Sequence, residues 1–77
     1  MTSNTKEIVV YISYENERPA EEIARELAGA MPAGRATLGV DLLTGGTEVR
    51  FYYDPAVLSL LKTYLAENNL RHDLTLV

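Results

Sequence analysis

The stretch RATLGVDLLTGGTEVRFYY, residues 35–53, predicts two β-strands joined by a tight turn. Apolar and polar residues alternate on both sides of Gly45-Gly46, as in strands with one buried face. Paired glycines suit the positive φ angles of a two-residue hairpin turn. The residue pairs expected from that turn are Leu38–Tyr53, Gly39–Tyr52, Val40–Phe51, Asp41–Arg50 and Leu42–Val49. The Asp41–Arg50 pair would join opposite charges and so supports this register.

The segments on either side of the hairpin predict a strand–helix–strand–strand–helix–strand order. The β-branched and aromatic run before it predicts a strand, and apolar residues at helical spacing predict two amphipathic helices. Asp54-Pro55 predicts the start of the second helix, with Asp54 as its N-cap, and Asn68-Asn69 predicts its left-handed end. The expected elements are strands over residues 7–14, 35–43, 48–53 and 70–77, a helix over residues 19–31, and a helix over residues 54–67.

With right-handed connections, this order predicts an α+β fold of the ferredoxin-like βαββαβ kind, a two-layer sandwich with antiparallel sheet order 4-1-3-2. We expect residues 7–77 to form that single domain and residues 1–6 to form a flexible tail. Both helices would cover one face of the sheet and leave the other face open. The residues expected on the buried side of the second helix are Val57, Leu58, Leu60, Leu61, Tyr64 and Leu65.

Composition narrows the classes of function. The 77 residues include no cysteine, which excludes disulfides, zinc–thiolate sites and cysteine nucleophiles. The net charge of −4 argues against a nucleic-acid backbone as partner, because proteins that bind one present clustered Lys and Arg. The sequence shows neither a secretory-signal pattern nor an apolar stretch of about 18 residues. A cytoplasmic protein without membrane contact is therefore expected.

The open face of the predicted sheet is the main candidate binding site. Val9 and Tyr11 would come from the first strand, and Arg50 and Tyr52 from the third. In RNA-recognition motifs, aromatic residues on the same strands stack on bases, but here the chain is acidic and Arg50 is expected opposite Asp41. Two alternatives remain: these residues only stabilise an exposed sheet surface, or they are buried against a partner or a second copy.

The loop Glu15-Asn16-Glu17-Arg18 is a second candidate, because loops commonly carry function. The alternative is that it is only a solvated charged loop, since nothing in it repeats a known site geometry.

The sequence offers no catalytic or metal-binding group. His72 lacks an orienting acid, since the adjacent Asp73 would point to the opposite face of a strand. Ser13 and Ser59 have no companion base. Asp41, Asp54 and Asp73 do not form a metal-like cluster. We expect no enzymatic activity, no metal and no cofactor.

Several short segments resemble a known class of small bacterial domains. Val10-Tyr11-Ile12, Arg18-Pro19-Ala20 and TEVRFY at residues 47–52 resemble the appended βαββαβ domains of the LytR C-terminal and SPOR-like kind. SPOR domains bind glycans on the sheet face, which implies a site at Tyr11 and Tyr52. The first loop is also similar to that of ACT ligand-binding domains.

Taken together, these features predict a non-catalytic protein–protein interaction or adaptor module. It would use the open sheet face or an edge strand, with a homodimer as one form of that interaction. The alternative is a small-ligand or glycan-binding module of the SPOR-like or ACT-like kind.

Overall fold

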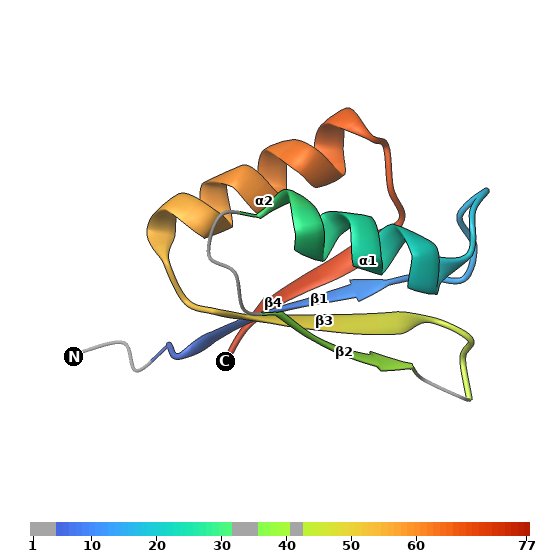
Figure 1. The fold of residues 1–77 in the computed structure, drawn as a ribbon, viewed down its shortest axis with the longest axis horizontal. Coiled ribbons are helices and arrows are strands. Elements are labelled where there is room, and N and C mark those ends of the chain that lie inside the picture. Colours follow the sequence, from blue (N-terminus) through green and yellow to red (C-terminus); the bar gives the residue numbers. More distant parts are fainter. Residues whose placement is uncertain (1–4, 32–35, 41–42) are drawn as a thin grey trace.

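Two helices lie on one face of an antiparallel sheet in the computed structural model, which describes residues 5–31, 36–40 and 43–77 (Figure 1). The elements in chain order are β1 (Glu7–Ile12), α1 (Ala20–Ala30), β2 (Ala36–Val40), β3 (Thr47–Tyr52), α2 (Pro55–Glu67) and β4 (His72–Leu76). The predicted α+β class is confirmed. Residues 1–4 of the expected tail lie outside the described residues, whereas the backbone of Lys6 bonds to both Val77 and Tyr53.

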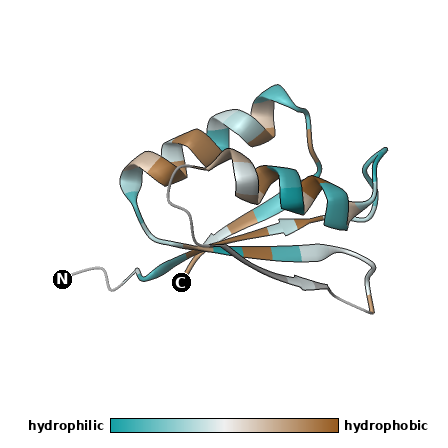
Figure 2. Cartoon of the chain, in the orientation of Figure 1, coloured by the Kyte–Doolittle hydropathy of each residue, from teal (hydrophilic) through white to brown (hydrophobic). Residues whose placement is uncertain are grey.

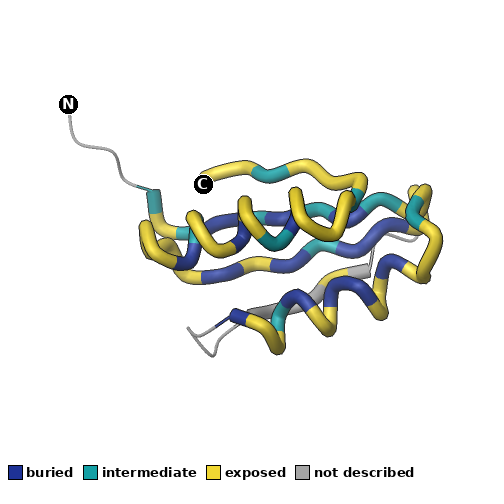
Figure 3. The backbone as a smooth tube through the Cα atoms, turned by 90° about the horizontal axis from the view of Figure 1, so that it is seen from above, coloured by how far each residue is buried: buried dark blue, intermediate teal, exposed yellow. Residues whose placement is uncertain are grey.

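The strands form a four-stranded sheet in the order β2-β3-β1-β4. β1 pairs antiparallel with both β3 and β4, and β2 pairs antiparallel with β3. Burial alternates along the central strands, because successive side chains point to opposite faces. Ile8, Val10 and Ile12 of β1 are fully buried beneath the helices. Figure 3 shows this contrast between the buried central strands and β4, which is exposed along most of its length.

The predicted two-residue hairpin is wrong. Leu38 pairs with Val49 instead of Tyr53, and Val40, the last residue of β2, lies opposite Thr47. The strands are therefore joined by residues 41–46, of which 41 and 42 lie outside the described part of the chain. Arg50 lies opposite Thr37, the position expected for Asp41, which is outside the described residues. The shift covers an even number of positions, so the paired residues of β2 and β3 stay on their predicted faces, and alternation alone could not reveal the error.

The helices follow their predicted caps and buried faces closely. α1 begins after Pro19 and buries a stripe formed by Ala20, Ile23, Ala24 and Leu27. At the start of α2, Asp54 Oδ1 accepts a hydrogen bond from the Ala56 N–H at 2.8 Å, as an N-cap should. At its end, Asn69 adopts a φ of 53°, which confirms the left-handed end. Leu60 is the exception, since it is 46% exposed at the margin of the apolar arc.

The core lies between the two layers. Brown, apolar segments of α1 and α2 face the sheet in Figure 2. The core residues are Ile8, Val10, Ile12, Ala20, Ile23, Ala24, Leu27, Met31, Val49, Phe51, Val57, Leu61 and Leu65. Because the helices bury only one face of the sheet, the other face supplies the main surface on which side chains from several strands meet.

Gly46 packs where no side chain fits, which gives a stability test. A Cβ at this position would lie 2.8 Å from the Ile12 carbonyl oxygen and closer still to the Tyr11 hydroxyl. We expect Gly46→Ala to lower the free energy of unfolding by about 1–3 kcal/mol through overpacking. Gly29→Ala in α1, where a Cβ meets nothing within 4 Å, should instead raise it by about 0.5–1 kcal/mol. Urea unfolding followed by circular dichroism measures both, and equal effects of the two variants would contradict this packing.

Candidate functional site

The open sheet face carries a mixed row of polar and aromatic side chains. Val9 and Tyr11 are half-buried there, whereas Arg50 and Tyr52 are exposed. The strand registers also place Glu7, Glu48, Asp73 and Thr75 on this face. The four residues predicted for this site thus share one face of the sheet.

Arg50 lies at the centre of a small ion-pair network on this face. Its Nε lies 2.6 Å from Glu48 Oε1, and its Nη1 lies 3.2 Å from Glu7 Oε1. The hydrogen bond that Arg50 donates to Glu48, more than the charge of Glu7, raises the pKa of Arg50 above its usual range. The guanidinium is therefore not a free cation for a phosphate, because two carboxylates already accept its donors.

Tyr11 is less available than the sequence suggests. Its hydroxyl hydrogen-bonds to Thr44 Oγ1 in the β2–β3 connection, and Thr44 Oγ1 also accepts a hydrogen bond from the Gly46 N–H at 3.4 Å. Gly46 itself is buried against the tyrosine ring. This connection therefore covers the end of the open face where Tyr11 lies, and the tyrosine holds the loop in place.

Tyr52 is the exposed aromatic residue of the open face. It is 61% exposed and pairs with Glu7, whereas Tyr11 pairs with Glu48. The two positions are offset by four residue steps along β1, which corresponds to about 13 Å along the strand. The two tyrosines therefore do not form a joint stacking platform. Val9 and Arg50, which lie opposite each other, occupy the space between them.

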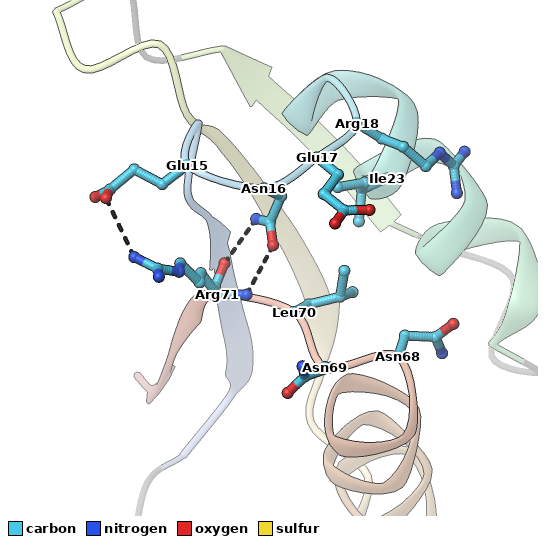
Figure 4. A pocket seen from close by; sticks show the side chains of 9 residues that line it. All are labelled: Glu15, Asn16, Glu17, Arg18, Ile23, Asn68, Asn69, Leu70 and Arg71. Atoms are coloured by element: carbon cyan, nitrogen blue, oxygen red, sulfur yellow. Dashed lines mark hydrogen bonds and ion pairs between the residues drawn. The ribbon is translucent and has the colours of Figure 1, made fainter.

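A second candidate is a groove of about 480 Å³ between the β1–α1 loop and the α2–β4 connection (Figure 4). The predicted residues Glu15, Asn16, Glu17 and Arg18 line one side. The sequence interpretation missed the other side, which Asn68, Asn69, Leu70 and Arg71 form. Buried Ile23 supplies an apolar contact between the two sides.

Asn16 ties the two sides of the groove together. Its Nδ2 donates to the carbonyl oxygens of Ser13 at 2.8 Å and Arg71 at 3.0 Å, while its Oδ1 accepts from the Arg71 N–H at 2.8 Å. The carboxamide thus reproduces the pairing of a strand backbone just beyond the end of β1, where Ser13 N–H donates to Arg71 O at 3.1 Å. An Arg71–Glu15 ion pair at 3.2 Å adds to this clamp. The role of Asn16 here is therefore to join two loops.

The charged groups at the groove are largely engaged by the protein itself. Arg18 forms ion pairs with Glu22 at 2.6 Å and with Glu26. Its side chain extends along α1 in Figure 4, and the hydrogen bonds that it donates to these two glutamates raise its pKa. Glu17 and Asn69 are exposed, and their side chains make no hydrogen bond or ion pair with the described residues. They are the polar groups that the groove offers to a small ligand.

No other cluster in the described part of the chain suggests chemistry. Residues 5–31, 36–40 and 43–77 contain no group of three His, Asp or Glu side chains placed to hold a metal ion. His72 Nδ1 lies 2.8 Å from the Leu70 carbonyl oxygen on an exposed strand. The register places His72 beside Ile12 and Asp73 beside Tyr11, so the two point to opposite faces, as expected.

Searches for similar proteins add no family assignment. The chain matches no family model, no curated protein and no solved structure. Among the described residues, neither helix has the length and apolar character needed to span a bilayer.

The Asn16 clamp predicts a stability difference between two asparagines. Asn16→Ala removes hydrogen bonds that join segments 55 residues apart, whereas Asn68→Ala removes one bond to the Tyr64 carbonyl within its own helix. We expect Asn16→Ala to cost about 1–3 kcal/mol, because it leaves the Arg71 N–H without its partner. Asn68→Ala should cost about 0.5 kcal/mol. Thermal and urea unfolding measure the stability lost in each variant. A larger loss in Asn68→Ala than in Asn16→Ala would contradict the clamp.

Proposed function

We propose that this chain is a ferredoxin-like, non-catalytic interaction module that binds a protein partner through the open face of its sheet or along a sheet edge. The observation that carries the proposal is the exposed Tyr52 beside Val9 and Arg50, on a face that no helix covers. Tyrosine and arginine are enriched at interface centres, because each combines a large contact area with hydrogen-bonding capacity.

The charge arrangement on the face favours a protein over a nucleic acid. Arg50 is shared between Glu7 and Glu48, and Asp73 adds a further carboxylate to the face. Among the described residues of this face, a phosphate backbone would meet these acids and no free cation. A protein surface with its own polar rim can instead pack on Val9 and Tyr52 while the paired charges stay solvated at the margin.

A small-ligand or glycan-binding function is the second candidate, and the groove favours it. Ile23 and Leu70 offer apolar contact, and Glu17 and Asn69 offer hydrogen-bonding groups on facing segments. A pocket with apolar contact and a few convergent polar groups is the common form of a ligand site. The resemblance of the sequence to SPOR-like and ACT domains favours this second candidate function.

Two equally exposed tyrosines test the open face. Tyr52 is 61% exposed on that face, and Tyr14 is 62% exposed in the turn after β1, beyond the residues that pair in the sheet. We expect the wild type and Tyr14→Ala to bind the same members of an immobilised synthetic peptide library. Tyr52→Ala should weaken that binding by about tenfold or more, because it removes a central aromatic contact. No retained peptide, or equal loss in the two variants, would contradict the proposal.

The groove is tested on the same protein by chemical-shift mapping with muropeptides, free amino acids and nucleotides. Saturable shifts at Glu17, Asn69 and Leu70 with one of these ligands, and none on β3, would support the second candidate. Shifts confined to β1 and β3 with a library peptide support the first.

A further inference from the structure

β4 presents an unpaired row of backbone groups on its outer side. Glu7 and Val77 exchange hydrogen bonds, from Glu7 N to Val77 O at 3.0 Å and from Val77 N to Glu7 O at 2.9 Å. Bonded and non-bonded positions alternate along an antiparallel pair, so every second residue of β4 points its N–H and C=O away from β1. Those residues are His72, Leu74 and Leu76. No described strand lies beyond β4.

This edge carries few of the features that protect edge strands from pairing. Residues 72–76 include no proline, glycine or lysine, and Asp73 is the single carboxylate. Leu74 is half-buried against the core, and Leu76 is 45% exposed next to it. The outward row therefore combines free backbone groups with apolar side chains, which suits another β-strand better than it suits solvent.

We propose that a second copy of this chain pairs antiparallel along β4, about a two-fold axis at Leu74. This inference deepens the proposed function, on which it rests, by naming the partner and the edge. The two sheets would continue into one, and their open faces would lie side by side. Such a contact is isologous, because the same strand supplies both sides.

Charge and the length of the strand both favour this register over its neighbours. With the axis at Leu74, the two Leu74 residues face each other, His72 faces Leu76, and Asp73 faces Thr75. The strands would then exchange about six hydrogen bonds, from the outward groups of both copies. An axis at Asp73 would place the two carboxylates directly opposite each other, which is unfavourable. The register at Leu74 also pairs β4 over its whole length.

Two leucines of equal exposure provide the test. Leu76 lies on the proposed edge and is 45% exposed, whereas Leu60 lies on α2 and is 46% exposed. Sedimentation equilibrium of the full chain, from micromolar to millimolar concentration, should show a monomer–dimer equilibrium. Leu76→Lys should weaken the dimer by at least about tenfold, because it places a solvated charge on the pairing edge. Leu60→Lys should leave it unchanged.

Two further measurements test the proposal even if the Leu76→Lys variant does not fold. Asp73→Asn should strengthen the dimer about two- to threefold, because the two Asp73 carboxylates remain diagonal neighbours in the proposed register. Added salt should also strengthen it, since each copy carries a net charge of −4. A monomer over the whole concentration range overturns the inference, as does equal weakening by the two lysine variants or weakening by Asp73→Asn.

This experiment separates the inference from the proposed function. Binding of library peptides that depends on Tyr52, observed on a monomeric protein, would keep the open face as a site and remove the self-pairing. A monomeric protein that also binds no library peptide would contradict both the open-face site and the self-pairing.

Discussion

The structure depends on the pairing of β1 with strands on both of its sides. β1 is the strand that bonds to both β3 and β4, so it joins the β2–β3 unit to the C-terminal part of the chain. Ile8, Val10 and Ile12 are fully buried. Backbone pairing and apolar burial thus act on the same few residues, and each stabilises the geometry that the other needs. Both candidate sites take their positions from this strand, since the open face includes its outer side chains and the groove begins where it ends.

The fold class and the helices were predictable because they depend on short-range patterns. The alternation of apolar residues, the apolar stripes of the helices, and the Asp54 and Asn69 ends each require only local rules. The register of β2 against β3 was not predictable from these rules. A tight turn at Gly45-Gly46 and the longer connection actually present leave the paired residues of β2 and β3 on the same faces. The sequence pattern is compatible with both arrangements. The packing of Gly46 against Tyr11, which accompanies the longer connection, is visible only in the tertiary structure.

The candidate site also combines features that the sequence pattern predicts with features that only the tertiary structure shows. The periodicity of two placed Val9, Tyr11, Arg50 and Tyr52 on one face, which the structure bears out. It could not show that Tyr11 is bonded to Thr44, or that Arg50 lies opposite Thr37 and is shared by Glu7 and Glu48. Those contacts depend on the register and on the path of the connection. In the groove, Asn68-Asn69 was interpreted as a helix end, which is correct, but its position opposite the β1–α1 loop follows only from tertiary structure.

The Asn16 clamp has a consequence for how the domain opens. β4 is largely exposed, and Leu74 is its half-buried contact with the core, so side-chain burial alone holds it weakly. The carboxamide of Asn16 fastens the residue just before β4 to the residues just after β1. Partial unfolding that releases the whole C-terminal strand must therefore break this link. Amide hydrogen exchange at Arg71 would then report the detachment of the whole strand as a single cooperative event, while β2, β3 and the helices stay protected.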